Sequence, residues 1–400
     1  MTSRLSIINT RGIAGPLLIE GDRIAAVGEP APKDTEILDA NGAHIAPGIV
    51  DLGVFAVDKA ACIAGGITRV ALMPDQFPVL DDPGIVQRSA LAAKPDLWVH
   101  PLAAATRGLA GRELAEYAMM ARAGAKAVAT GRGWIAESGV MLKALTYAGS
   151  LGLTMISHAE DGGITGEAVA TAGETASRLG LSSAPASAEA MAMARDIALV
   201  RETGAKLHFR QVTTKSSFDL IRSAKAEGLP ITCGIAPTHL FLSDIAVSDF
   251  RTFARLSPPL RSEEDRQAAI EAVRDGTIDV VCSAHDPRGP EAKRLPFADA
   301  EPGAAGAETL LALGLGLVRD GVIGMERLFE MLALNPSRIL GVDSGILAPG
   351  APADLILFDP DAPWIIDGDT FQARAGNTPF DRMPTQGKVL QTIKGGRVLT

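Results

Sequence analysis

Cysteine is scarce in this sequence. The 400 residues include only three, Cys62, Cys233 and Cys282, and they lie far apart along the chain. Three scattered thiols exclude a disulfide framework and lack the paired spacing of a zinc-binding knuckle. The N-terminal stretch "MTSRLSIINTRG" has no apolar core of the kind found in signal peptides. Both absences are typical of a protein that works in a reducing cytoplasm, and we expect it there.

Positive charge, long apolar runs and aromatic residues are also in short supply. The chain has 38 Lys and Arg against 47 Asp and Glu, a formal net charge of −9. Because the chain has no net positive charge to attract phosphate groups, neither nucleic acid nor an anionic membrane surface is expected as a partner. No apolar run reaches the roughly 18 residues that a membrane-spanning helix needs. Hydrophobic residues make up 47% but aromatic residues only 4%, so we expect a globular core of small and aliphatic side chains.

The two ends of the chain differ from its middle. Residues 1–48 contain short alternating runs, such as "RLSIIN" and "GPLLIEGDRIAAVG", separated by Gly and Asp. This pattern is typical of β-hairpins. Residues 343–400 have the same texture in "GILAPGAPADLILFDPDAPWIID" and "GKVLQTIKGGRVLT". We therefore predict that both termini pair into one small β domain, with residues 49–342 inserted between them.

The middle of the chain alternates short apolar runs with amphipathic helical stretches. Strands are predicted at residues 48–54, 68–73, 97–104, 125–130, 153–160, 206–212, 230–236 and 278–286. Helices are predicted between them, for example at residues 111–124, 140–152, 186–204, 216–228 and 262–276. Eight strand–helix units favour an α/β fold of the closed (β/α)8 TIM-barrel type. A doubly wound open sheet is the alternative, but the first strand lacks the glycine-rich phosphate turn of such folds.

Polar side chains gather where the predicted strands end, and this is the end at which such barrels carry their sites. The six residues are His158, Gln211, Thr213, His239, His285 and Asp286. His208 is assigned to the opposite face of its strand, because its spacing from Gln211 is odd. His100 and His44 show no pattern that singles them out.

Several stretches, taken in order, resemble the dihydroorotases of the amidohydrolase superfamily over nearly the whole chain. They include "APGIVDL", "AGGITRVALMPDQFPVLDDP", "ISHAED", "LNPSRILG" and "GAPADLILFDPDAPWIID". The resemblance implies a barrel flanked by a small β-sandwich domain that both termini build. It also implies one or two zinc ions, which in that family polarise a cyclic amide and activate a bound water.

The resemblance also identifies the positions that hold zinc in the family, and this chain departs from the pattern at most of them. Only His158 is kept as a ligand. The side chains at the other five positions are unfit for zinc: Gly53, Phe55, Thr130 or Gly131, Gln211 and Ala284. Structural and catalytic zinc sites need three or four protein ligands. We therefore expect no zinc, no other cofactor and no catalytic residue, and a vestigial pocket lined by His158, His239, His285 and Asp286.

Substrate recognition is expected to be lost with the metal. The family's Asn in its "MPNT" segment becomes Asp75, whose charge would repel an anionic substrate, and a second Asn becomes Ser257. The resemblance then implies a pseudoenzyme of pyrimidine biosynthesis, which joins aspartate carbamoyltransferase in a hetero-oligomer as a structural partner. Two alternatives are carried forward. One is an active cyclic amidohydrolase with a rearranged site of His158, His285, Asp286 and a cysteine; the other is a module that senses a pyrimidine intermediate.

Overall fold

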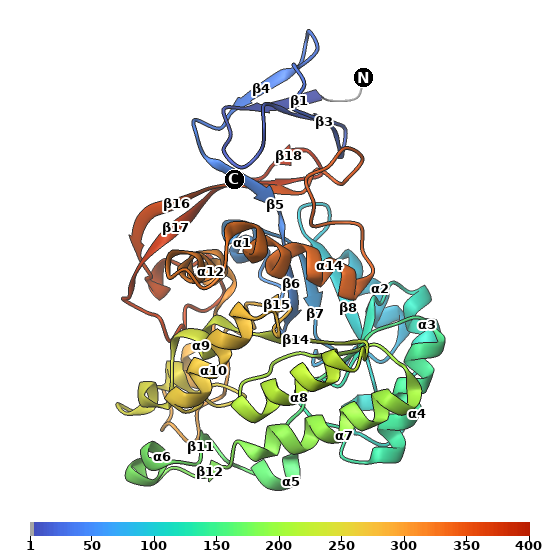
Figure 1. The fold of residues 1–400 in the computed structure, drawn as a ribbon, viewed down its shortest axis with the longest axis vertical. Helices are drawn as coiled ribbons and strands as arrows, with labels where there is room; N and C mark the ends of the chain where they lie inside the picture. Colours follow the sequence, from blue (N-terminus) through green and yellow to red (C-terminus); the bar gives the residue numbers. More distant parts are fainter. Residues whose placement is uncertain (1–3) are drawn as a thin grey trace.

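The computed structural model describes residues 4–400 and contains a closed barrel joined to a β domain (Figure 1). Eight parallel strands follow one another around the barrel in chain order. They are β6 (Ile49–Val54), β7 (Ile67–Leu72), β8 (Trp98–Ala104), β9 (Ala127–Ala129), β10 (Met155–Ser157), β13 (Leu207–Phe209), β14 (Ile231–Ile235) and β15 (Val280–Val281). The predicted barrel and all eight predicted strands are confirmed.

The first and last strands meet through hydrogen bonds at the ends of β6 and β15. The amide of Phe55 donates to the carbonyl of His285 at 2.9 Å. The amide of Ser283 donates to the Asp51 carboxylate at 2.9 Å. Burial raises the pKa of this Asp51 carboxyl. These contacts close the barrel beside the ends of the strands, where its mouth lies.

Helices surround the barrel on the outside (Figure 1). The longer ones are α2 (Pro83–Leu91), α4 (Ser138–Ser150), α7 (Ser187–Thr203), α8 (Lys215–Ala226), α10 (Glu263–Arg274) and α12 (Leu310–Arg319). The shorter ones are α1 (Lys59–Ala64), α3 (Tyr117–Arg122), α5 (Gly162–Thr165), α6 (Glu174–Leu179), α9 (Pro237–Phe241), α11 (Pro290–Lys293), α13 (Met325–Phe329) and α14 (Asn335–Leu340). A two-stranded ribbon, β11 (Ala170–Thr171) with β12 (Ser183–Ala184), flanks α6.

Local sequence explains where these helices begin. Helix α10 starts at Ser262, whose hydroxyl accepts a hydrogen bond from the amide of Asp265 at 3.2 Å, with three acidic residues in the first turn. The predicted helix at 111–124 is shorter than expected, and only α3 forms. Its first residues instead pair with the end of β8: Leu114 forms a bridge with Thr106, and the amide of Arg107 donates to the carbonyl of Glu113.

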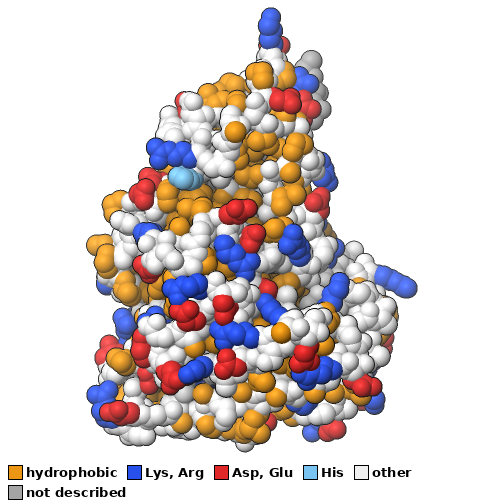
Figure 2. Space-filling view, viewed as in Figure 1, with side chains coloured by type: hydrophobic (Ala, Val, Ile, Leu, Met, Phe, Trp, Pro, Cys, Tyr) orange, Lys and Arg blue, Asp and Glu red, His pale blue; other side chains and the backbone are white. Residues whose placement is uncertain are grey.

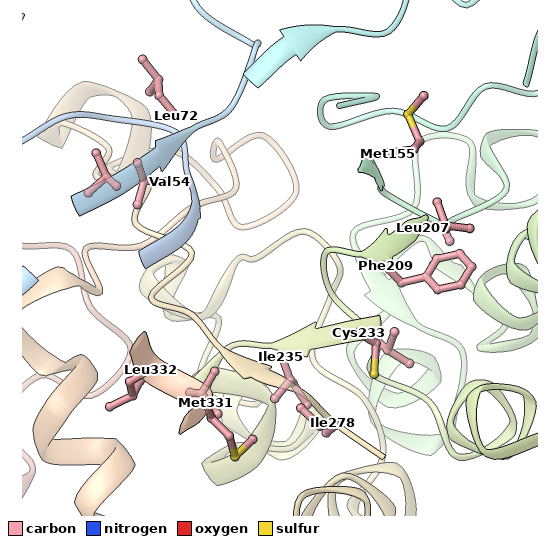
Figure 3. Close-up of a cluster of buried hydrophobic side chains, with 14 of the residues drawn as sticks. Val54, Leu72, Met155, Leu207, Phe209, Cys233, Ile235, Ile278, Met331 and Leu332 are labelled. Atoms are coloured by element: carbon pink, nitrogen blue, oxygen red, sulfur yellow. The ribbon is translucent and has the colours of Figure 1, made fainter. Parts of the chain in front are cut away.

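Two hydrophobic layers hold the barrel together. Alternate strand residues point inward and form a core of small and aliphatic side chains: Val50, Leu52, Ala71, Leu102, Ala127, Ala129, Ile156 and Val280. Their neighbours point outward to the helices, and Figure 3 shows part of this second layer, including Leu207, Phe209 and Ile235. Strand alternation produces both layers. The shortage of aromatic residues fits an interior filled by alanine and branched aliphatic chains.

The strands of both termini form two four-stranded sheets. One contains β1 (Arg4–Ile8), β2 (Leu17–Glu20), β3 (Arg23–Val27) and β4 (Glu36–Asp39). The other contains β5 (His44–Pro47), β16 (Leu355–Ile365), β17 (Pro384–Lys394) and β18 (Arg397–Val398). Strand β5 pairs antiparallel with β16, so blue and red segments lie side by side in Figure 1. The sheets share a core that includes Ile7, Ile19, Leu355 and Ile393.

Charges of both signs are interspersed over the face of the molecule shown in Figure 2. Within residues 4–400, no helix combines the length and the apolar character that crossing a membrane would require.

Candidate functional site

A small cavity lies at the mouth of the barrel, beyond the carboxyl ends of the strands. Its volume is about 30 Å³, room for about two water molecules. Side chains from several strand ends fill the surrounding space: Phe55, Arg132, Arg210, Gln211, His239, Ala284 and Asp286. Side chains thus fill most of the space over Arg210, whereas an adjoining cavity of about 310 Å³ remains open beside Arg132, His158 and Glu160.

Arg210 occupies the centre of this mouth. Its side chain is 2% exposed, and its stem passes Gly53 so closely that a Cβ there would lie 3.5 Å from Arg210 Cγ and Cδ. One Nη donates to His158 Nδ1 at 3.2 Å, and the other donates to Gln211 Oε1 at 3.4 Å. Burial lowers the pKa of this guanidinium. Among the described residues, no carboxylate lies within ion-pair distance of it. The guanidinium is therefore hydrogen-bonded only to neutral acceptors and keeps an unpaired charge.

A second arginine closes the mouth from the loop after β9. The Arg132 guanidinium stacks on the Phe55 ring, with Cζ 3.7 Å from the ring centroid. Arg210 approaches the same ring, with its Cζ 5.0 Å from the centroid. Arg132 also pairs with Asp286 at 2.7 Å, and Arg288 pairs with that carboxylate at 3.0 Å. With two arginines bound to it, Asp286 is tied into an ion-pair network and is poorly placed to act as a base.

The two histidines at the mouth have their ring nitrogens engaged. His158 accepts from Arg210 at Nδ1, and its Nε2 lies 3.6 Å from Glu160 Oε2. His239 donates from Nε2 to the carbonyl of Pro258 at 3.2 Å and accepts at Nδ1 from Gln211 Nε2 at 2.9 Å. Burial, and then the nearby charge of Arg261, lower the pKa of His239 to about 4. His239 is therefore neutral at pH 7.

His285 lies outside this cavity, contrary to its predicted place in the vestigial pocket. Its Nε2 is 3.1 Å from Asp58 Oδ2, and its Nδ1 accepts from the amides of Gly306 and Ala307, each at 3.2 Å. Residues 284–286 lie beyond the end of β15, and Ala284 has φ +49°. Here Ala284 and Asp286 line the cavity, while His285 forms a bridge with Ala304 and its ring turns away. The rearranged catalytic group of His158, His285 and Asp286 is thus not brought together.

The cysteines considered for that rearranged site are buried thiols. Cys62 lies within α1 and is completely buried, and burial raises the pKa of its thiol. Cys282 lies within the barrel interior, and burial raises the pKa of its thiol to about 12. A thiol becomes a nucleophile only as thiolate. Neither cysteine is poised for such chemistry.

The position of the family's bridging acid is closed by backbone geometry. Gly131 has φ +81°, and a Cβ there would lie 2.7 Å from Asp75 Oδ1. That same oxygen accepts a hydrogen bond from the amide of Arg132 at 2.8 Å. The other candidate position, Thr130, uses its hydroxyl to accept from the amide of His158 at 3.0 Å. A metal-bridging side chain would need this loop to move.

The donor set at the mouth does not fit a zinc ion. Gly53, Gly131 and Ala284 supply no side-chain donor atom, and the Phe55 ring is covered by Arg132. His158 uses its Nδ1 lone pair for Arg210, and its other nitrogen faces Glu160. A guanidinium in the same space would also repel a divalent cation. No step of any reaction is therefore assigned to a metal here.

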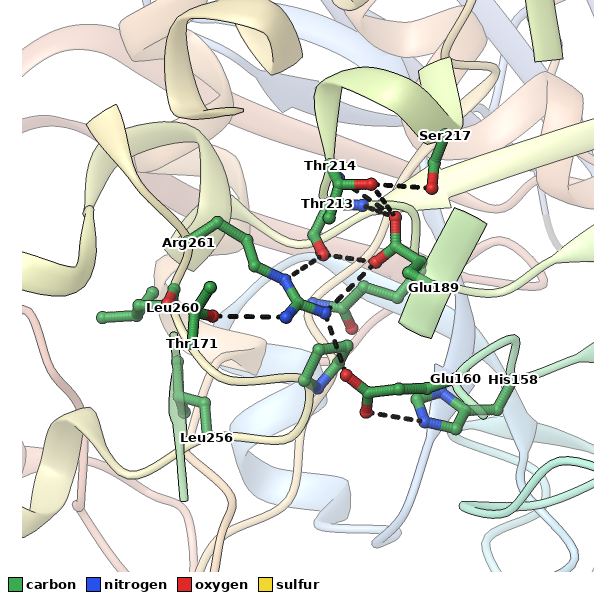
Figure 4. A network of polar contacts seen from close by, with 12 residues as sticks. His158, Glu160, Thr171, Glu189, Thr213, Thr214, Ser217, Leu256, Leu260 and Arg261 are labelled. Carbon is green, nitrogen blue, oxygen red and sulfur yellow. Dashed lines mark hydrogen bonds and ion pairs between the residues drawn. The ribbon is translucent and has the colours of Figure 1, made fainter. Parts of the chain in front are cut away.

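A buried polar network supports the mouth from one side (Figure 4). Arg261 donates to Glu160 at 2.9 Å and to the hydroxyl of Thr213 at 2.9 Å, and it lies 3.4 Å from Glu189. Glu189 also accepts from the amides of Thr213 and Thr214 at 2.9 and 3.0 Å. Burial raises the pKa of the Glu160 carboxyl, but the hydrogen bond from His158 and the charge of Arg261 outweigh it and lower the pKa to about 2.

Sequence reasoning missed the two arginines that fill the mouth. A charged residue inside the apolar run "LHFRQV" was the available signal for Arg210. The assignment of His208 to the outer face is wrong: its neighbours Leu207 and Phe209 pack outward, and its Nδ1 lies 2.9 Å from Thr232 Oγ1. Regular strand pairing ends at Phe209, so parity counted back from Gln211 does not apply.

Comparison with known proteins places this arrangement in a wider class. The sequence pattern of the amidohydrolase family matches residues 101–399. The chain belongs to that family. Among curated relatives, dihydroorotases of Geobacter metallireducens and Geotalea daltonii are each 37% identical over 399 residues, which cover 96% of this chain and 94% of each relative.

Solved structures agree with the fold. The L-hydantoinase of Arthrobacter aurescens superposes with a TM-score of 0.88 at 24% identity, covering 100% of this chain and 96% of that one. The dihydropyrimidinase of Brevibacillus agri gives a TM-score of 0.84 at 20% identity, covering 100% and 95%. At these identities the likeness establishes the architecture of a barrel with a terminal β domain.

Proposed function

We propose that this protein is a non-catalytic, dihydroorotase-like chain that serves pyrimidine biosynthesis as a structural partner of aspartate carbamoyltransferase. The observation that carries the non-catalytic half is the Arg210 guanidinium at the barrel mouth. It takes the Nδ1 lone pair of His158 and packs in the space that Gly53 leaves free. A site without a metal and without a free base cannot activate water for amide hydrolysis by the family's route.

The curated relatives named dihydroorotase support the assignment to pyrimidine biosynthesis. The structural role rests on a separation within the fold. The substituted positions lie at the mouth, whereas the two hydrophobic layers and the outer helices depend on other residues. A chain can therefore lose the chemistry of its site and keep its surfaces for assembly.

Exposed apolar side chains offer contacts for a partner. Phe77, on the loop after β7, is fully exposed, and Met191 on α7 is 56% exposed. Covering an exposed apolar side chain with a partner lowers the free energy, and aromatic and Met residues are enriched at protein interfaces. Both residues lie on the barrel, and we expect aspartate carbamoyltransferase to contact it there. Ile365 is a comparably exposed apolar side chain on the terminal sheets, 61% exposed, so substitutions at both places distinguish the two surfaces.

The non-catalytic half is tested by metal analysis and a turnover assay on the purified chain. We expect zinc far below one equivalent and no hydrolysis of dihydroorotate, with or without added zinc. The dihydroorotase of Geobacter metallireducens, assayed in parallel, is the positive control for turnover. Stoichiometric zinc together with chelator-sensitive turnover would refute this half of the proposal.

The partner half is tested by co-expression with aspartate carbamoyltransferase from the same organism, followed by sizing of the product. We expect a complex of both chains, weakened by Phe77→Ser. The matched control is Ile365→Ser, which removes a comparable side chain, 61% exposed, from strand β16 of the terminal domain. Carbamoyltransferase that assembles and works equally well alone would rule out a structural role.

The two alternatives remain separately testable. Turnover of a hydantoin or of dihydroorotate without metal would favour a rearranged active site. Heat on calorimetric titration with carbamoyl aspartate would favour a sensor of a pyrimidine intermediate. The buried, unpaired charge of Arg210 is the feature that an anionic intermediate would meet in the small cavity, and the adjoining cavity of about 310 Å³ beside Arg132 and His158 offers room for such a molecule.

A further inference from the structure

A second cavity lies between the barrel and the terminal β domain, away from the mouth. Its volume is about 430 Å³, within the size range of small-molecule sites. Arg69, Trp98 and His100 line it from β7 and β8, and Lys126 lines it just before β9. Asp354 and Lys394, next to and within the strands β16 and β17, form the opposite wall. Since these barrel residues lie at or near the amino ends of their strands, the cavity is at the opposite end from the mouth.

The wall of this cavity carries an excess of buried positive charge. Arg69 and Lys394 both pair with the single carboxylate of Asp354, each at 2.8 Å. All three side chains are at most 4% exposed. Two buried cations therefore share one anion, which leaves one positive charge uncompensated at high desolvation cost.

The rim of the cavity adds to this excess. The lining has five Lys and Arg side chains and three Asp, although the chain carries a formal net charge of −9. At the rim, Arg23 pairs with Asp343 and Arg397 pairs with Asp96, so the addition to the excess comes from Lys126. Lys126 is exposed at the rim, and no ion pair among residues 4–400 involves it. The local charge is thus opposite in sign to that of the protein as a whole, and anions will be drawn to this point.

Trp98 and His100 shape the wall of the cavity: Trp98 holds its cations in place, and His100 presents an unpartnered nitrogen. Arg69 and Lys394 each lie 4.4 Å from the Trp98 ring centroid, and Lys94 lies 5.0 Å from it. Cation–π attraction of this kind holds the cations in place without neutralising them. His100 is 5% exposed, and its Nε2 has no hydrogen-bond partner. An unpartnered buried nitrogen costs free energy unless something binds it.

We propose that this cavity binds a small molecule bearing a phosphate group with at least two negative charges. Such an anion would compensate the excess charge of Arg69 and Lys394. Phosphate oxygens match the several N–H donors of guanidinium and ammonium groups, and they would also accept from His100. The site is independent of the barrel mouth, and the proposed structural role neither requires it nor excludes it.

The test is calorimetric titration of the full chain with inorganic pyrophosphate at roughly 0.15 M salt. We expect saturable binding of one equivalent, and Lys126→Ala should weaken it about tenfold, the loss of one charged contact. Lys126 is exposed, so this variant will fold. Lys143→Ala on α4 is the matched control, since it removes an exposed lysine remote from the cavity, and it should leave the affinity unchanged.

A second variant and a second anion complete the experiment. His100→Leu should weaken pyrophosphate binding while the circular dichroism spectrum stays the same, because leucine fills a similar volume but has no nitrogen that can bind the anion. Citrate, a polycarboxylate of similar charge, should bind at least tenfold more weakly than pyrophosphate. No saturable binding, equal binding of citrate, or binding that Lys126→Ala leaves unchanged would each overturn the proposal.

Discussion

Replacement of Arg261 by methionine should destabilise the protein in a pH-dependent way. Arg261 is 3% exposed and serves two buried carboxylates, Glu160 and Glu189, which are 11% and 1% exposed. Methionine keeps much of the side-chain length but removes the charge and all of the N–H donors. Both carboxylates then remain buried without their cation.

The structure sets the size of the effect. Breaking a buried ion pair by removal of one partner costs about 3–5 kcal/mol. Glu189 keeps its hydrogen bonds from the amides of Thr213 and Thr214, so we expect the lower end, about 3 kcal/mol at pH 7. The pKa of Glu160 lies at about 2 instead of 4.5, and the hydrogen bond from His158 and the charge of Arg261 both lower it, so Arg261 accounts for only part of this shift.

The pH dependence follows from the direction of that shift. A carboxyl whose pKa is lowered on folding stabilises the protein fully above its unfolded pKa, here 4.5. This contribution is lost as the pH falls from 4.5 through about 2. In Arg261→Met the pKa of Glu160 moves back toward its ordinary value, so the variant loses less of its stability as the pH falls. The stability gap between the two proteins should therefore narrow in acid.

Urea unfolding at pH 7 and at pH 3.5 measures this gap. A matched control is Arg201→Met, which breaks an exposed pair with Glu227, whose side chains are 48% and 43% exposed. Exposed pairs contribute little, so the control should unfold almost like the parent protein at both pH values. The reasoning fails if Arg261→Met costs less than about 1 kcal/mol at pH 7, or if its cost is the same at both pH values.

Three further outcomes are expected from unfolding measurements. Gly131→Ala should lower the free energy of unfolding by about 1–3 kcal/mol, because its φ is +81° and the new Cβ would meet Asp75. Gly133→Ala is the control, because a Cβ there would have no atom within 4 Å. Asp354→Asn should cost about 3–5 kcal/mol, because two buried cations lose their shared anion; a cost near zero would contradict the charge excess at the junction. The pKa of His239, about 4, means that stability is lost as pH falls from 6.5 to 4; His239→Asn should flatten that branch of the stability curve.

The barrel could be predicted because each strand is a local pattern. Short apolar runs and helical periodicity recur eight times, and hydrophobic burial satisfies both at once. The helix predicted at 111–124 failed at its start for a tertiary reason. Leu114 and Glu113 pair with the segment after β8, and no local signal in "GRELAEY" distinguishes that pairing from helix.

At the candidate site, the sequence predicts only which donor atoms are absent from the positions that the family resemblance implies. Each missing ligand, such as Gly53 or Ala284, can be read from a single position once the family pattern is recognised. What fills the space cannot be read this way, because the direction of Arg210 depends on the residue at which strand β13 ends. The junction cavity is harder still. Trp98 and Lys394 are almost 300 positions apart, and only the pairing of both termini into one domain brings them together.

Loss of the ligands and gain of the arginine are physically linked. A Cβ at position 53 would lie in ordinary van der Waals contact with two carbons of Arg210, at 3.5 Å, so the ring of a histidine there would have to share the space beside that stem. With a zinc ion near His158, the guanidinium would face a divalent cation in a medium of low dielectric constant. Conversely, without the metal, the His158 nitrogen needs a donor, and Arg210 provides one at 3.2 Å. Each change removes an obstacle to the other. Restoring single histidines would therefore leave Arg210 in the cavity, and the barrel would keep its shape without recovering a metal site.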